Sequence, residues 1–261
     1  MEKTYILEAK DISIGYTNKK NSTTVASNVS ISLEKGKLTA LIGANGIGKS
    51  TLLRTLIGIQ WPLSGTVYLE NKDIHSLDNL TLAQHLSVVL TDKLPPSNLT
   101  VFELIALGRQ PYTNWIGKLS TEDITKVNEA MELTQISHLA DKRHFEISDG
   151  QLQIVLIARA LAQDTPLIIL DEPTTHLDLL HKVTLFKLLK KLTQETGKSI
   201  LFSTHDIDMA IQLSDEMILM TPESVVQDQP CKLIMKGSFN TLFQEEHIGF
   251  DAEKGKFVIK G

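Results

Sequence analysis

The 261-residue sequence predicts an α/β fold with a mostly parallel core sheet, an antiparallel β region at its N-terminal end and an inserted helical subdomain. Continuous apolar runs at 166–173 and 198–206, separated by a helical pattern at 177–196, are typical of parallel strands that are covered on both faces. A succession of helical patterns over residues 100–163 predicts the inserted subdomain.

Alternating apolar residues near the N-terminus predict strands at 5–16 and 25–33, and 65–74 indicates another strand followed by a turn. The run "LTALI" predicts a buried strand, and "STLLRTLIGI" shortly after it has helical spacing. The helical patterns "TVFELIALGR" and "STEDITKVNEAMELTQI" each begin with Thr or Ser, which are suitable N-caps. In the tail we expect a strand at "EMILM", a helix near "SFNTLFQEE" and a hairpin around 253–255.

The segment "GANGIGKS" has the order G-x-x-x-x-G-K-S of a phosphate-binding loop and joins the predicted strand to the helix. The first N–H groups of that helix have no intrahelical partner, and with the helix dipole they favour an anion. Gly43, Gly46 and Gly48 let the backbone wrap closely around phosphate oxygens. We expect Lys49 to reach the β and γ phosphates and Ser50 to ligate Mg²⁺. The alternative is a glycine-rich turn without a ligand.

Two acids end the apolar run 166–173, at the edge of an α/β sheet where ligands bind. In a protein with a phosphate-binding loop, Asp171 is the expected Mg²⁺ ligand. Glu172 precedes Pro173, so we expect its backbone to be extended and its carboxylate to act as general base on the water that attacks the γ phosphate. The alternative is that both acids only mark the exit of the strand into solvent.

His205 ends the next apolar strand and is expected beside Glu172, as a hydrogen-bond donor near the γ phosphate. A purely structural histidine is the alternative.

Ser148 and Gly150 stand just before another long helical pattern, which gives a second helix N-terminus suited to phosphate. Taken alone, Ser148 is better explained as an N-cap.

Composition narrows the function classes. The 31 acidic and 26 basic residues give a formal charge of −5 with no basic block, so nucleic acid is not an expected partner. The single cysteine, Cys231, excludes an internal disulfide and agrees with a reducing compartment. The N-terminus lacks the apolar core of a signal peptide, and no run reaches the length of a membrane span, so a membrane role requires partner subunits.

Four motifs in order, "GANGIGKST", "ISDGQ", "LIILDEPTTHLD" and "STHD", resemble the ATPase subunit of ATP-binding cassette (ABC) transporters, which are P-loop NTPases. The resemblance covers about 5–220. It implies ATP and Mg²⁺ as cofactors, and a head-to-tail homodimer in the ATP-bound state that sandwiches each ATP between the phosphate loop of one subunit and the "ISDGQ" helix of the other. It also implies one ABC ATPase domain over 1–225, with core segments 1–95 and 164–225, a helical subdomain at about 96–163, and a tail at 226–261.

The resemblance assigns catalytic roles to Lys49, Glu172 and His205. It places Tyr16 against adenine, with an ordinary strand-end aromatic as the alternative, and Asp178 at the dimer seam. The implied nucleotide-binding residues are Tyr16, Gly43, Asn45, Gly46, Gly48, Lys49, Ser50, Thr51, Ser148, Gly150 and Asp178, and the implied metal ligands are Ser50, Asp171 and Asp92.

Two positions depart from the family pattern. Asp149 replaces the first glycine of the L-S-G-G-Q signature, where an added carboxylate would repel ATP unless it points away. Asp92 stands where the family usually has a glutamine, and a carboxylate there could ligate Mg²⁺.

The segment 100–115 is most similar to importers of iron-siderophore, haem or cobalamin, and lies where the membrane partner docks in the family. The implied partners are two integral-membrane permease subunits and, through them, a substrate-binding protein, with the chain at the cytoplasmic face of the cell (inner) membrane. Tyr112 and Trp115 are candidate docking anchors, and core packing is the alternative for both. The competing function is a soluble ABC ATPase that acts in iron–sulfur cluster assembly or another non-transport complex.

Overall fold

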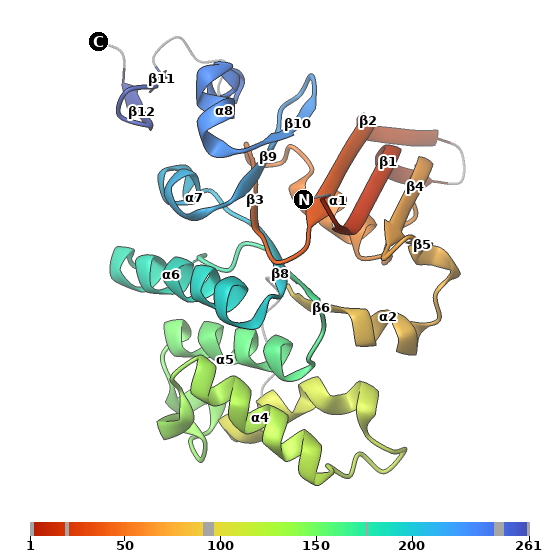
Figure 1. Cartoon of the computed structure of the whole chain (residues 1–261), viewed down its shortest axis with the longest axis vertical. Helices are drawn as coiled ribbons and strands as arrows, with labels where there is room; N and C mark the ends of the chain where they lie inside the picture. Colours follow the sequence, from red (N-terminus) through yellow and green to blue (C-terminus); the bar gives the residue numbers. More distant parts are fainter. Residues whose placement is uncertain (1–2, 19–20, 91–96, 176, 243–247, 260–261) are drawn as a thin grey trace.

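The structure is a computed structural model that describes residues 3–18, 21–90, 97–175, 177–242 and 248–259. These residues form a four-stranded sheet, a six-stranded sheet and a two-stranded hairpin, with helices around them (Figure 1). The predicted α/β fold, with its antiparallel N-terminal region, mostly parallel core sheet and helical segment, is confirmed.

The four-stranded sheet is antiparallel and has the strand order β2-β1-β4-β5. Its inward-facing apolar residues pack on one face of the six-stranded sheet, with helix α1 (Lys49–Leu56) in the same core cluster. The strands are β1 (Tyr5–Asn18), β2 (Asn21–Glu34), β4 (Ser64–Leu69) and β5 (Lys72–Asp73).

The six-stranded sheet has the order β10-β9-β3-β8-β7-β6 and is parallel except for β10. The two faces of β3 enter different cores, because Leu41 packs toward α1 while Ala40 and Ile42 pack toward the opposite face. The strands are β3 (Leu38–Gly43), β6 (Leu86–Val89), β7 (Leu167–Leu170), β8 (Ser199–Ser203), β9 (Glu216–Met220) and β10 (Val225–Asp228).

Helices α6 (Leu179–Thr196) and α7 (Ile207–Leu213) cover the second face of this sheet (Figure 1). Helix α6 follows β7 and confirms the helical pattern predicted at 177–196, whereas α7, which follows β8, was not predicted. A short helix that the sequence analysis did not predict, α2 (Asn79–His85), precedes β6 and has no fully buried residue.

A group of helices lies at one end of the molecule (Figure 1). Thr100, Ser120 and Ser148 are N-caps with capping boxes, so the predicted helix starts are confirmed. Inside the group, the Arg109 Nε donates to Asp123 Oδ1 at 2.8 Å and Nη1 donates to the Ala162 carbonyl. The elements are α3 (Val101–Ala106), the 3₁₀ helices η2 (Leu107–Tyr112), η3 (Ser137–Leu139) and η4 (His144–Glu146), α4 (Thr121–Leu133) and α5 (Asp149–Ala162).

The tail differs partly from the expectation. The predicted hairpin is present as β11 (Ile248–Asp251) and β12 (Lys256–Ile259). The α-helix, however, is α8 (Pro230–Met235), which precedes the predicted position, and "SFNT" forms the 3₁₀ helix η5 (Ser238–Thr241), while 243–247 lie outside the described residues.

Aromatic packing ties this tail to the core. Phe239 is fully buried and stacks on Phe250, with ring centroids 4.6 Å apart, and Phe250 meets Phe257 edge to face. The expected tail boundary at residue 225 falls inside β10, which pairs with β9, so the first residues of the expected tail belong to the core sheet. Over the described residues, none of the helices has both the length and the apolar character that crossing a membrane would need.

Candidate nucleotide-binding and catalytic site

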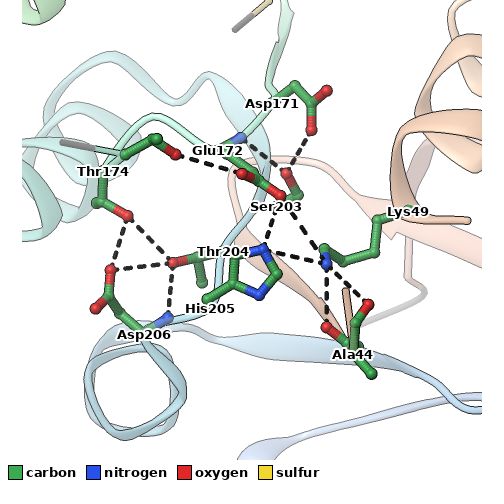
Figure 2. Close-up of polar contacts among 11 residues, drawn as sticks. Ala44, Lys49, Asp171, Glu172, Thr174, Ser203, Thr204, His205 and Asp206 are labelled. Atoms are coloured by element: carbon green, nitrogen blue, oxygen red, sulfur yellow. Dashed lines mark hydrogen bonds and ion pairs between the residues drawn. The ribbon is translucent and has the colours of Figure 1, made fainter. Parts of the chain in front are cut away.

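The candidate site lies where three neighbouring strands, β3, β8 and β7, end at the same edge of the sheet. The phosphate-binding loop follows β3, the two acids follow β7, and His205 follows β8 two residues after the strand ends. Because the strands are parallel and adjacent, segments far apart in sequence meet here (Figure 2).

The phosphate-binding loop has the backbone that its glycines predict. Gly46 and Gly48 have φ values of 75° and 111°, a region that other residues avoid, and Gly48 is the N-cap of α1. A Cβ atom at Gly48 would lie 2.2 Å from Cγ1 of Val25, whereas one at Gly46 would meet no atom within 4 Å. Gly48 is therefore required both for its conformation and for its close packing.

Lys49 is the buried cation of the site, with 5% of its surface exposed. Its ammonium donates to the carbonyl oxygens of Gly43 and Ala44 at 3.0 and 3.2 Å. Burial lowers the pKa of Lys49 from its usual value, while the nearby Glu172 and Asp171 carboxylates oppose that shift. A poorly hydrated ammonium held by neutral carbonyls retains most of its capacity to attract an anion.

Glu172 and His205 form the contact that the sequence predicted. The distance between Glu172 Oε1 and His205 Nε2 is 2.8 Å, and Lys49 Nζ lies 4.0 Å from the same carboxylate oxygen and 3.4 Å from the same imidazole nitrogen (Figure 2). The carboxylate, the imidazole and the ammonium thus meet around one point.

The expected extended backbone at Glu172 is wrong. Its φ is 46°, in the left-handed region, which costs a non-glycine residue about 1–2 kcal/mol. Two hydrogen bonds hold this conformation: the Glu172 N–H donates to Ser203 Oγ at 2.8 Å, and its carbonyl accepts from the Thr175 N–H at 3.1 Å. The local preference of a residue before proline is overridden by these partners.

Further polar contacts lie beside the two acids. Asp206 accepts from Thr174 Oγ1 and from Lys182 Nζ, both at 2.8 Å, which links the segment after β8 to the start of α6. A pocket of about 450 Å³ opens beside these contacts. Its lining residues are Asn45, Gly46, Glu172, Thr174, Thr175, Lys182, His205 and Asp206.

Tyr16 is half-exposed, and its hydroxyl lies 2.6 Å from Thr51 Oγ1 at the start of α1. It borders a hollow of about 640 Å³ that Arg54, Gln60 and Trp61 also line. The exposed Trp61 stacks on His75 with ring centroids 3.7 Å apart. Tyr16 is therefore placed at an open, partly aromatic surface next to the phosphate-binding loop.

The residues predicted at the dimer seam lie apart from this cluster. Ser148 Oγ accepts from the Gln151 N–H, which agrees with the N-cap alternative, and Asp178 caps α6 by accepting from the His181 N–H at 2.9 Å. Although Ser148, Gly150 and Asp178 are in the described part of the chain, none of them lines the pocket with Glu172 and His205. Within one copy of the chain, Ser148 and Asp178 therefore act as helix caps, and contact of all three residues with ATP stays a prediction.

Of the positions that depart from the family pattern, Asp149 is exposed in the first turn of α5, and Asp92 lies outside the described residues. Four residues of the site were missed by the sequence analysis: Thr174, Lys182, Ser203 and Asp206. Three of them, Thr174, Ser203 and Asp206, lie inside the motifs "LIILDEPTTHLD" and "STHD", so the sequence could have indicated that they belong to the site. The groups that each of them contacts are seen only in the fold.

A family model described as "ABC transporter" matches residues 26–175, more than half of the chain. The chain belongs to the ABC transporter family. It is an ABC ATPase, an enzyme that binds and hydrolyses ATP.

This ABC ATPase is similar to several named proteins and solved structures. The iron(3+)-hydroxamate import ATP-binding protein FhuC of Bacillus subtilis (strain 168) is 38% identical over 222 residues, which are 85% of this chain and 81% of that protein. The achromobactin transport ATP-binding protein CbrD of Dickeya dadantii (strain 3937) is 37% identical over 238 residues, covering 91% and 87% of the two chains. A dimeric, post-hydrolysis structure of an ATP-binding cassette bound to ADP and Pi aligns with a TM-score of 0.73 at 28% identity, over 86% of this chain and 98% of that one.

Gly48→Ala tests the geometry of the phosphate-binding loop. The added methyl group would overlap Val25, so we expect the free energy of unfolding to fall by about 2–4 kcal/mol and ATP binding to be lost. Gly46→Ala is the matched control, because it adds the same group at a positive φ without a clash, and it should cost about 1 kcal/mol. Urea unfolding measures both values, and equal losses would show that the packing against Val25 does not matter.

Proposed function

We propose that this chain is the ATP-hydrolysing subunit of an ABC importer for an iron-siderophore, haem or cobalamin. The observation that carries the hydrolytic role is the 2.8 Å contact between Glu172 and His205, with Lys49 within 4.0 Å of both side chains. The import role is supported by the similarity to proteins named for iron(3+)-hydroxamate import and achromobactin transport.

ATP binds with its phosphates in the loop between β3 and α1. The N–H groups at the start of α1 donate to phosphate oxygens, and the helix dipole adds a positive potential at the same place. Lys49 exchanges its carbonyl partners, Gly43 and Ala44, for the β and γ phosphates, which attract its positive charge more strongly. Tyr16 stacks on the adenine from the open surface beside the loop.

Hydrolysis uses Glu172 as general base. Its carboxylate takes a proton from the water that attacks the γ phosphate, while the His205 Nε2–H donates to Glu172 Oε1 and holds the carboxylate in place. Lys49 stabilises the negative charge that develops on the transferred phosphoryl group.

The oxygen donors at this site suit Mg²⁺. The Ser50 hydroxyl and the Asp171 carboxylate are hard ligands of the kind that Mg²⁺ prefers, and the described residues contain no cluster of three or more His, Cys, Asp or Glu side chains that could hold a metal ion without the nucleotide. We propose that Ser50 and Asp171 hold the ion together with phosphate oxygens. When bound, Mg²⁺ neutralises phosphate charge.

Two copies of the chain complete each site. Ser148 and Gly150 at the N-terminus of α5 approach the ATP held by the other copy, and Asp178 lies at the seam between them. Within one copy these residues do not line the Glu172 pocket, and a similar cassette has a dimeric structure with ADP and Pi, both of which support this arrangement. ATP binding closes the dimer and hydrolysis reopens it.

The membrane partners dock on the helical subdomain. We assign this subdomain to about 96–163 of a single ABC ATPase domain over 1–225, with 226–261 as a tail. Trp115 is 94% exposed in a turn between η2 and α4, which favours docking over core packing. Tyr112 is half-buried, with its ring 4.0 Å from the Arg109 guanidinium. Two permease subunits bound here would hold the chain at the cytoplasmic face of the cell membrane and connect it to a substrate-binding protein.

Glu172→Gln tests the catalytic role. The amide keeps the shape of the side chain but cannot accept the proton of the attacking water, so kcat should fall at least about 100-fold while ATP affinity changes little. Asp208→Asn, which removes an exposed carboxylate near His205, is the control and should keep the wild-type rate. Steady-state phosphate release and equilibrium ATP binding measure the two effects, and a Glu172→Gln variant with wild-type turnover would rule out Glu172 as the base.

Trp115→Ala tests the docking surface. Removing this exposed indole should weaken co-purification of an integral membrane protein in detergent about tenfold, without a change in ATP affinity. Trp61→Ala removes an equally large exposed side chain away from the helical segment and should leave co-purification intact. A wild-type chain that purifies in a complex with soluble proteins only would contradict the importer role and favour an assembly ATPase.

A further inference from the structure

Ser203 is the last residue of β8, the strand that lies between the phosphate-loop strand β3 and the acid-bearing strand β7. Its side chain is fully buried. Ser203 Oγ donates to Asp171 Oδ1 at 2.7 Å and accepts the Glu172 N–H at 2.8 Å (Figure 2). One hydroxyl group therefore contacts both acids that follow β7.

The direction of these two hydrogen bonds follows from the groups involved. A serine hydroxyl has one proton to donate, and a backbone N–H can only donate, so the Ser203 proton must point to the Asp171 carboxylate. The Asp171 carboxylate is itself 7% exposed, so a charge-assisted hydrogen bond is valuable to it. Ser203 thereby fixes one carboxylate oxygen of Asp171.

The same hydroxyl supports the left-handed conformation of Glu172. Strained backbone persists only where the surrounding structure holds it, and the Glu172 N–H is anchored by Ser203 while the preceding Asp171 N–H donates to the Val89 carbonyl at 2.8 Å. This conformation directs the Glu172 carboxylate to His205. Without the hydrogen bond to Ser203, the backbone of Glu172 would relax and its carboxylate would move away from His205.

We propose that Ser203 is a positioning residue for ATP hydrolysis, which sets the place of Glu172 without touching the nucleotide. The inference rests on the proposed function, because it assigns the base to Glu172. It predicts a defect in turnover rather than in ATP binding, since in the described part of the chain no hydrogen bond joins Ser203 to Lys49 or to the N-terminus of α1.

Ser203→Ala removes the hydroxyl and leaves the Glu172 N–H buried without its partner. We expect kcat to fall about 10- to 100-fold while KM for ATP changes less than about twofold. Equilibrium ATP binding in EDTA should also be unchanged, which provides a readout that does not depend on turnover.

Ser199→Ala is the matched control. Ser199 begins the same strand, is 2% exposed, and its Oγ accepts the Gly36 N–H at 3.0 Å, so the change removes the same group and one comparable buried hydrogen bond at the opposite end of β8. It should cost similar stability but keep the wild-type kcat. The comparison separates a positioning role from a loss of stability.

A double-mutant cycle tests whether Ser203 acts through Glu172. In the Glu172→Gln background, Ser203→Ala should reduce the residual turnover by less than about threefold, because the base it positions is already absent. Ser203→Cys is a second variant that keeps a weak hydrogen-bonding group, the thiol, at this position, and its kcat should also lie well below that of Ser199→Ala.

Kinetics, thermal unfolding and ATP binding are measured on the chain in the form in which it purifies, with any bound membrane partner. A Ser203 variant with the kcat of Ser199→Ala, or a full 10- to 100-fold loss in the Glu172→Gln background, would overturn the inference alone. A wild-type chain that hydrolyses no ATP would overturn the proposed function as well, so the two failures are distinguishable.

Discussion

The pairing of β8 between β3 and β7 is the constraint on which the rest of the site depends. These parallel strands end at one edge of the sheet, so the phosphate-binding loop, the two acids and His205 must meet there. Residues in all three strands are buried, and the apolar packing on both faces fixes their register. Polar groups more than 150 positions apart, such as Lys49 and His205, are thereby held within 3.4 Å.

Charge and strain are concentrated at this edge. The buried Lys49 ammonium faces the Glu172 carboxylate, and Glu172 adopts a conformation that its own sequence disfavours. Both features have a physical cause in the neighbouring strands: carbonyl groups solvate the ammonium, and Ser203 anchors the backbone of Glu172. The stable sheet thus maintains an arrangement that would not persist in an isolated segment.

Much of the fold could be predicted because its signals are long or chemically specific. The apolar strands and the Thr and Ser N-caps are recognised from local patterns. The glycines of the phosphate-binding loop indicate backbone conformations with positive φ, which few other residues adopt. The helix α2, the helix α8 and the strand β10 were missed because each spans only four to seven residues, too few for a periodic apolar pattern to be recognised. The conformation of Glu172 could not be predicted, because the hydroxyl that determines it comes from another strand. The contact between Lys182 and Asp206 could not be predicted either, because the two residues come from different elements of the fold.

We propose that each ATP is held by the phosphate-binding loop of one copy and the α5 N-terminus of another. Single-turnover hydrolysis by an equal mixture of Lys49→Ala and Ser148→Arg chains tests it most directly, because in a mixed dimer both lesions fall on one site and the other is intact. About half of the dimers are then mixed and about a quarter of all sites are functional, so we expect hydrolysis near a quarter of the wild-type amplitude, with each variant alone inactive. No recovery in a sample with proven mixed dimers would contradict the shared site and leave Ser148 as the N-cap of α5 only.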